Sequence, residues 1–142
     1  MEKMKTNLQR IATLLAIIIG AMAVFAGGQV LLGKVPGYYV IDWLPVYNFT
    51  MGVVSIFITA LLIWRNHRYA WLAAFVTLFF HMVVMVLLQT VYRQVVAPDS
   101  IRAMTIRLAV WLLIILLMLV RRRAVQKGVF LNEDHPVGAS QQ

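Results

Sequence analysis

The chain has 142 residues, of which 62% are hydrophobic and only 13% are charged, and its formal net charge is +8. A soluble domain of average composition has about 25% charged residues, so this composition indicates a membrane protein. The chain contains no cysteine, which excludes disulfides, thiolate metal sites and cysteine nucleophiles. The basic residues gather at the ends of apolar runs, a distribution that is typical of membrane topology and argues against nucleic-acid binding.

The first apolar run covers residues 8–32 and follows a basic start at Lys3, Lys5 and Arg10. A secretory signal peptide also begins with basic residues, but its apolar region is only about 7–15 residues long. Ala21-Met22-Ala23 could serve as a cleavage site, yet the apolar character continues beyond it. We therefore expect an uncleaved transmembrane helix.

Three more apolar runs follow, at residues 47–64, 69–92 and 101–120. At 1.5 Å per residue, each can cross about 30 Å of hydrocarbon as a helix. Short connections place successive helices antiparallel to one another. The sequence thus predicts an all-α, integral membrane four-helix bundle in up-down order over residues 1–123. The polar residues 124–142 are expected to form a disordered tail.

The basic residues also predict the orientation of this bundle. One side of it would carry nine of them: Lys3, Lys5, Arg10, Arg65, Arg68, Arg121, Arg122, Arg123 and Lys127. The other side would carry Lys34, Arg93 and Arg102, with Asp42 and Asp99 beside them. Because lysine and arginine remain on the cytoplasmic side, both termini are expected in the cytoplasm.

Polar side chains within the predicted spans are concentrated in the outer half of the bundle. They are Gln29, Asn48, Thr50, Gln89, Arg93, Arg102, Thr105 and Arg107, with Asp42 in the loop above them. Polar residues in a membrane are costly and often functional, so this distribution favours an outward-facing polar pocket. The alternative is that these groups are interfacial or form hydrogen bonds between helices.

Arg107 is the most unusual of these residues, because it lies about 10 Å along the fourth predicted helix from its outer end. A charge at depth costs about 2.5 kcal/mol or more, so another group should offset that cost. A salt bridge to Asp42 would do so, and so would an anionic ligand or a lipid headgroup. Alternatively, the Arg107 side chain extends outward to reach water.

His81 lies near the middle of the third predicted helix, in a row with Thr77, Met85, Gln89 and Arg93 that recurs every four residues. Such a row follows one slowly drifting helix face, which we expect to point into the bundle. His81 could relay protons, bond a quinone carbonyl or bind metal. It could equally be a neutral histidine that is hydrogen-bonded to a neighbouring helix.

Several site types are not expected. The other histidines, His67 in the inner loop and His135 in the tail, cannot pair with His81 as axial haem ligands. The sequence shows no cluster of histidines or carboxylates for a metal and no nucleophile or phosphate-loop motif. We therefore assign no catalytic residue.

The first span carries small residues at spacings that let helices approach closely. They are Ala12, Ala16, Gly20 and Gly28, with Ala23 and Gly27 as a second pair. This face could form a dimer or partner interface, or it could pack within the bundle.

Two short segments give the chain a resemblance to a known family. The first helix ends in Phe25-Ala26-Gly27-Gly28, and the second begins at Pro45-Val46-Tyr47-Asn48, with Gly52 soon after. In these segments and in topology the chain resembles the DoxX-like group of small bacterial membrane proteins. The resemblance implies a bacterial inner-membrane protein that works beside a redox system, and no functional residue is carried over from it.

These observations favour a non-enzymatic membrane-embedded binding or accessory subunit. Its outer pocket would hold a lipid, a quinone-like molecule or another amphipathic ligand, or it would dock on a larger membrane complex. The candidate ligand-binding residues are Arg107, His81, Gln89, Asn48, Asp42 and Arg93. The expected partners are membrane lipids and either further copies of the chain or other subunits. The alternatives are a small oligomeric transporter or channel subunit, and an enzyme with His81 as acid or base and Arg107 as anion clamp.

Overall fold

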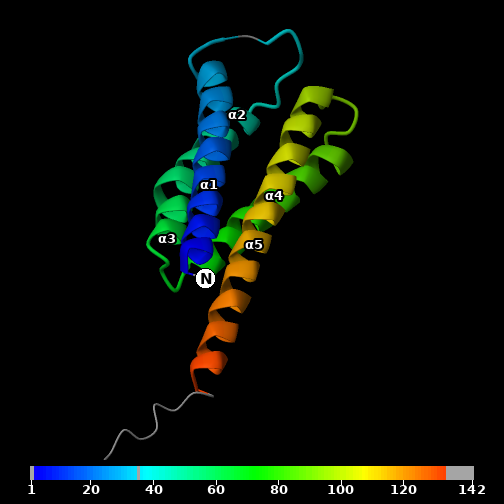
Figure 1. Cartoon of the computed structure of the whole chain (residues 1–142). Helices are drawn as coiled ribbons and strands as arrows, with labels where there is room; N and C mark the ends of the chain where they lie inside the picture. The colour runs from blue at the N-terminus through cyan, green and yellow to red at the C-terminus, as the bar shows by residue number, and fades with distance from the viewer. Residues whose placement is uncertain (1, 35, 134–142) are drawn as a thin grey trace, which may run out of the picture.

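The computed structural model describes residues 2–34 and 36–133, and this part of the chain contains helices and no strands (Figure 1). Four helical segments are long and apolar enough to cross a membrane. They are Thr6–Leu31, Leu44–Trp64, Ala70–Thr90 and Pro98–Gln126. The all-α fold with four candidate spans is therefore confirmed. The second and fourth segments begin three residues earlier than the sequence predicted.

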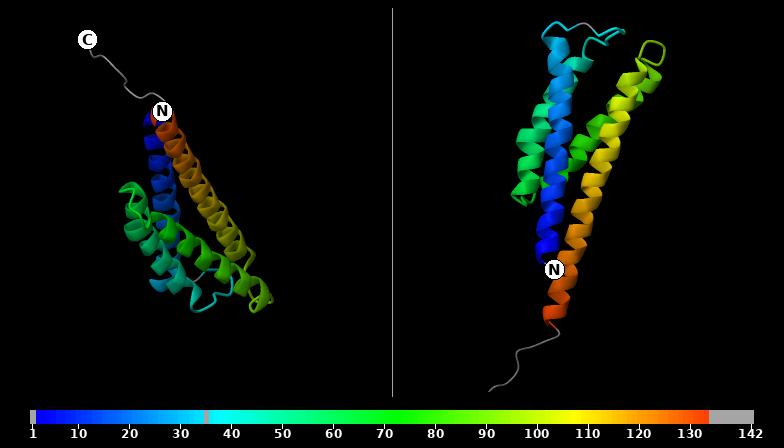
Figure 2. Two further views of the ribbon diagram at one scale, coloured as in Figure 1. Left: turned by 90° about the horizontal axis from the view of Figure 1, so that it is seen from below. Right: turned by 45° about the horizontal axis from the view of Figure 1, so that its top comes forward.

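The helices in chain order are α1 (Glu2–Leu31), α2 (Leu44–Val54), η1 (Ser55–Ala60), α3 (Leu61–Trp64), α4 (Ala70–Thr90) and α5 (Pro98–Glu133). The second span is continuous from α2 through α3, and η1 is a π-helical stretch within it. Along the chain each span packs on the next, and α5 packs back on α1 (Figures 1 and 2). The spans thus alternate in direction, and the start of α1 and the end of α5 lie at one end of the bundle. We call this end the inner end and the opposite one the outer end.

The helix α5 extends further than the sequence analysis allowed. Residues 124–133, which were predicted to be disordered, continue it as far as Glu133. Extending an existing helix fixes one residue for each new hydrogen bond, whereas starting one is costly. Alanine, glutamine, lysine and leucine in this stretch are also good helix formers. The rest of the predicted tail, residues 134–142, lies outside the described residues.

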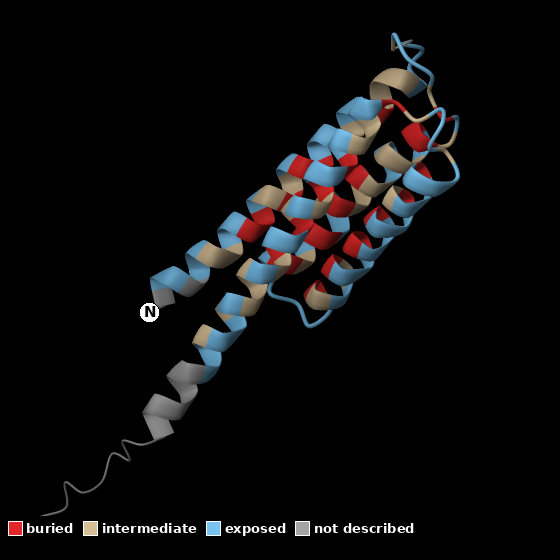
Figure 3. Ribbon diagram, turned by 90° about the vertical axis from the view of Figure 1, so that its right-hand side faces the viewer, coloured by how far each residue is buried: buried red, intermediate tan, exposed pale blue. Residues whose placement is uncertain are grey.

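The surface of the bundle is apolar on its outward side as well as between the helices. Figure 3 shows the buried residues on the faces where the helices meet, with exposed residues around the outside. Many large apolar side chains point outward, among them Leu14, Phe25, Phe57, Leu72, Phe79 and Leu116. Water would not favour so much exposed apolar surface, whereas hydrocarbon would.

Gly33 shapes the outer end of α1. It has a positive φ of 91°, which glycine adopts without a Cβ clash. The Gly33 N–H donates to the Val30 carbonyl, and the Lys34 N–H donates to the Gln29 carbonyl, each at 3.0 Å. This Schellman arrangement satisfies the last carbonyls of α1. The chain then leaves the helix and passes over the outer end of the bundle (Figure 1).

The backbones of α1 and α2 are in direct contact at glycines. A Cβ added at Gly27 would lie 2.5 Å from the Pro45 carbonyl oxygen, and one at Gly52 would lie 2.6 Å from the Gly20 carbonyl oxygen. Ala12, Ala16 and the other small residues of this face are buried as well, except for the half-buried Gly28. The face therefore packs within the bundle, which was one of the two alternatives for it.

A matched pair of substitutions tests this contact. At Gly27 an alanine meets backbone atoms, whereas at Gly28 the nearest atoms are 3.7 Å and 3.8 Å away on the Phe49 ring. We expect Gly27→Ala to lower the free energy of unfolding by about 1–3 kcal/mol, which is typical of overpacking. Gly28→Ala should be neutral or stabilising, because alanine is the better helix former.

The measurement is reversible unfolding of both variants in detergent. Since both substitutions change helix propensity equally, the difference between them isolates the clash at Gly27. Equal stability of the two variants would contradict the close approach of α1 and α2.

Candidate functional site

The buried residues on the inward face of α4 recur at alternating intervals of four and three residues. Six buried residues follow this spacing, Ala70, Ala74, Thr77, His81, Val84 and Leu88, and Leu78 is buried beside them. This is the spacing of helices packed at a small crossing angle. Thr77 and His81 lie on this face as expected, but Gln89 and Arg93 are exposed. A strict interval of four turns about 40° further at each step, so the predicted row leaves the inward face.

Arg107 occupies a core position on α5. The buried residues of this helix, Met104, Arg107, Trp111 and Ile114, follow the same alternation. Because α5 begins at Pro98, Arg107 lies about 14 Å along the helix, which is deeper than the sequence suggested. Only 5% of Arg107 is exposed, so its side chain does not reach outward to water.

The partner of Arg107 is a neutral amide. Arg107 Nη1 donates a hydrogen bond to Asn48 Oδ1 at 2.5 Å. Asp42, the carboxylate considered for this role, is exposed and makes no such contact. Among the described residues, the one salt bridge joins Arg102 and Asp99 on the surface. Arg107 is therefore a buried charge without a carboxylate partner in the described part of the chain.

The packing of α1 on α2 places Asn48. A Cβ at Gly27 would lie 3.1 Å from the Asn48 Cβ and 2.7 Å from the Phe49 nitrogen. The first turn of α2 is thus held against α1, and the Asn48 side chain is directed toward α5. The glycine contact of the fold and the polar contact of the site are adjacent.

A small cavity opens beside Asn48 and Arg107. It has a volume of about 100 Å³ and lies among α1, α2, the outer loop and α5. Its lining includes Tyr38, Tyr39, Asn48, Asp99, Ser100 and Arg107. Sites for whole drug-sized ligands have about 300–1,000 Å³, so this cavity has room only for a polar headgroup. His81 is not among the residues that line it.

His81 is bound to the second span next to Asn48. Its Nδ1 shares a hydrogen bond of 2.7 Å with Tyr47 Oη, and only 3% of the residue is exposed. This agrees with the interpretation of His81 as a histidine bonded to a neighbouring helix. Arg107 is also near enough to Tyr47 and His81 to interact electrostatically with both.

Further aromatic rings contact the Tyr47–His81 pair on both of its sides. Toward the outer end, the Tyr47 ring contacts Trp43, whose Nε1 donates a hydrogen bond of 3.1 Å to Tyr92 Oη. Toward the core, the His81 ring lies 6.4 Å from that of Trp111. Trp111 is fully buried, and its Nε1 has no hydrogen-bond partner among the described residues. A line of aromatic side chains therefore joins the second, third and fourth spans.

Two residues of this arrangement were not predicted from the sequence. Tyr47 was not among the candidate site residues, although it lies beside Asn48 in the same helix turn. Trp111 follows Arg107 by four residues, which places both on one face of α5. Of the six candidate ligand-binding residues, only Asn48 and Arg107 line the cavity, while Gln89, Arg93 and Asp42 are exposed.

Comparisons with known protein families, curated proteins and solved structures give no match to this chain. Within the described residues, no group of three or more histidines, aspartates and glutamates is placed to hold a metal ion. The site must therefore be interpreted from its own geometry.

Removal of the Tyr47 hydroxyl tests the contact with His81. We expect Tyr47→Phe to lower the free energy of unfolding by about 1–2 kcal/mol, because it leaves a buried histidine nitrogen without its partner. Tyr39→Phe is the matched control, since Tyr39 is exposed and makes no hydrogen bond among the described residues. The control should change the free energy of unfolding by less than about 0.5 kcal/mol. If both variants unfold like the unmodified protein, the Tyr47–His81 hydrogen bond contributes no stability.

Proposed function

We propose that this chain is a non-enzymatic membrane subunit that binds the polar headgroup of an amphipathic molecule in its outer cavity. The observation that carries the proposal is the pairing of Arg107 with Asn48 in place of a carboxylate. A buried charge is strongly unfavourable unless it is compensated. An anionic headgroup in the cavity would supply the compensation that the amide of Asn48 does not.

The size of the cavity refines the ligand class. About 100 Å³ accommodates a carboxylate, a phosphate or a single carbonyl, while the apolar remainder of the molecule would extend into the surrounding lipid. All three groups accept hydrogen bonds, as a guanidinium requires. Because Arg107 retains its full charge, we favour an anionic headgroup over the neutral carbonyl of a quinone.

Two other functions receive less support. An enzyme that used His81 and Arg107 on one substrate would need both in one cavity, and His81 does not line the cavity beside Arg107. An oligomeric transporter was suggested by the small-residue face of α1, which could form a dimer interface. In the structure this face packs against α2 of the same chain.

We also propose the bacterial inner membrane as the location, with both termini in the cytoplasm. The basic residues support this orientation, since Arg10, Arg65 and Arg121–Arg123 belong to one end of the bundle. The resemblance to the DoxX-like group stays a proposal, carried by the segments around Gly27 and Asn48.

The test compares ligand binding in variants of equal shape. Asn48→Asp is nearly isosteric and gives Arg107 a carboxylate partner, so it should preserve the fold and exclude an anionic headgroup. With oleate as the probe, we expect native mass spectrometry to show at least tenfold weaker binding to Asn48→Asp and to Arg107→Gln. Methyl oleate has the same chain without the charge, and a short-chain quinone provides a neutral carbonyl. Both should bind more weakly than oleate.

The control is Arg93→Gln, which removes an exposed arginine that does not line the cavity and forms no ion pair with a described residue. It should bind oleate like the unmodified protein. Oleate binding that is unchanged in Asn48→Asp would contradict the proposal, and so would tighter binding of the quinone than of oleate.

A further inference from the structure

The opposite end of the bundle holds a second, larger cavity. It has a volume of about 430 Å³ and lies among the first turns of α1, the turn between α3 and α4, and α5. Its lining includes Arg68, Trp71, Arg121 and Arg122, together with the apolar residues Leu8 and Met118. This volume lies within the range of ligand sites, unlike that of the outer cavity.

Two polar contacts fix the walls of this inner cavity. The Gln9 Nε2 donates to the carbonyls of Ile63, at 3.0 Å, and of Trp64, which joins α1 to the end of α3. Arg121 Nη1 donates to Asn66 Oδ1 at 2.5 Å, which joins α5 to the turn. The cavity is thus bounded by elements that are held to one another.

Asn66 is suited to its place in the turn. Its φ is 50°, the left-handed conformation that asparagine tolerates better than most residues. Its N–H donates to the Ile63 carbonyl at 3.0 Å, and the His67 N–H donates to the Leu62 carbonyl at 2.9 Å. This motif closes α3 and leaves the Asn66 side chain free to orient Arg121.

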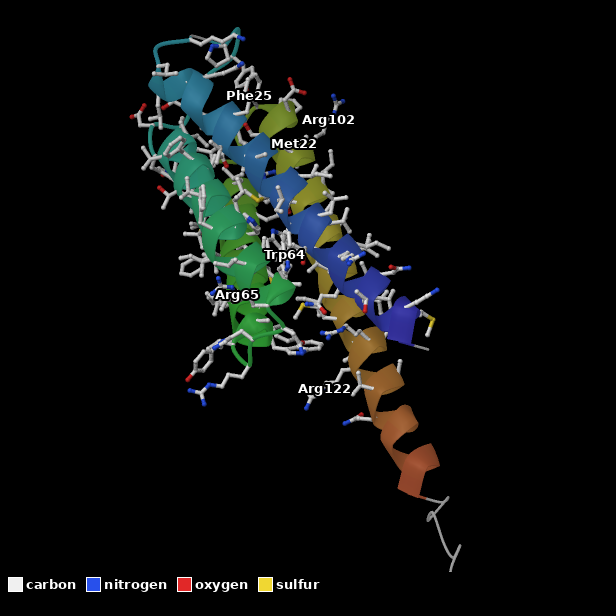
Figure 4. All side chains as sticks on the ribbon, turned by 60° about the vertical axis from the view of Figure 1, so that its left-hand side comes forward. Met22, Phe25, Trp64, Arg65, Arg102 and Arg122 are labelled. Atoms are coloured by element: carbon white, nitrogen blue, oxygen red, sulfur yellow. The ribbon has the colours of Figure 1, made fainter. Side chains whose placement is uncertain are left out.

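Arg68 of the inner cavity lies over the Tyr69 ring, whereas Arg121 and Arg122 have uncompensated charge and unused donors. The described acidic side chains, Asp42 and Asp99, belong to the opposite end of the bundle. Arg121 Nε is shielded from solvent and has no hydrogen-bond partner among the described residues. Arg122 is exposed and forms no ion pair with any described residue. In Figure 4 Arg122 and Arg65 lie at this end of the molecule and Arg102 at the other.

We infer that the inner cavity binds the phosphate headgroup of an anionic phospholipid. Arginines match the geometry of phosphate oxygens, and the apolar part of the lining would contact the glycerol and the first methylenes of the chains. Basic pockets between spans on the cytoplasmic side suit anionic lipid headgroups, and the cytoplasmic leaflet is the anionic one. The inference does not depend on the outer cavity, because the two cavities share no lining residue.

The experiment measures lipid retention by the full chain in native mass spectrometry. The probes are phosphatidylglycerol and phosphatidylcholine with identical acyl chains, which differ in the net charge of their headgroups. We expect preferential retention of phosphatidylglycerol. Each lost arginine should weaken retention about fivefold, so we expect about a fivefold decrease for Arg122→Gln and about a 25-fold decrease for Arg121→Gln/Arg122→Gln.

The matched control removes two exposed arginines from the other end, Arg93→Gln/Arg102→Gln, with the same change in net charge. It should retain phosphatidylglycerol like the unmodified protein. Because Arg122 has no described ion pair or hydrogen bond, its single substitution tests the site without disturbing the fold. Equal losses in the inner and outer double variants would overturn the inference. Equal retention of phosphatidylcholine and phosphatidylglycerol would overturn the assignment to an anionic headgroup.

Discussion

The backbones of α1 and α2 lie so close together that a methyl group does not fit at Gly27 or Gly52. This contact fixes the first turn of α2, and with it the side chains of Tyr47 and Asn48. Tyr47 then reaches α4 through His81, and Asn48 reaches α5 through Arg107. Two adjacent residues thus connect the second span to the other half of the bundle, so van der Waals packing at glycines determines where the polar contacts form.

The polar contacts differ in the charge that they leave uncompensated. The Tyr47–His81 pair is satisfied by its own hydrogen bond, and neither residue lines the outer cavity. The Arg107–Asn48 pair satisfies a donor but leaves a full positive charge in a medium of low dielectric constant, where its electrostatic effect is greatest. A carboxylate at position 48 would cancel this charge at similar volume. The amide therefore makes the outer cavity attractive to anions, which a satisfied ion pair would not.

The sequence was sufficient to predict the four spans, because hydrophobic length in a membrane is nearly independent of tertiary contacts. It also identified Arg107 and Asn48, since polar residues are conspicuous in apolar runs. The prediction that Gln89 and Arg93 face the interior of the bundle was wrong. Residues spaced four apart rotate gradually around the helix, whereas the buried residues of α4 recur at intervals of three and four. The pairing of Arg107 with Asn48 in place of Asp42 depends on the approach of α1 to α2, which a one-dimensional pattern does not contain.

The two cavities place positive charge in different physical environments. In the outer cavity a single guanidinium acts at depth, where screening by salt is weak and the small volume excludes large headgroups. In the inner cavity several arginines act near the membrane–water interface. There each arginine contributes less binding free energy, and salt screens its charge more strongly. If both cavities bind anionic headgroups as we propose, selectivity at the outer cavity should therefore come from size and desolvation. At the inner cavity it should come from the net charge of the headgroup, so that salt weakens binding there more than at Arg107.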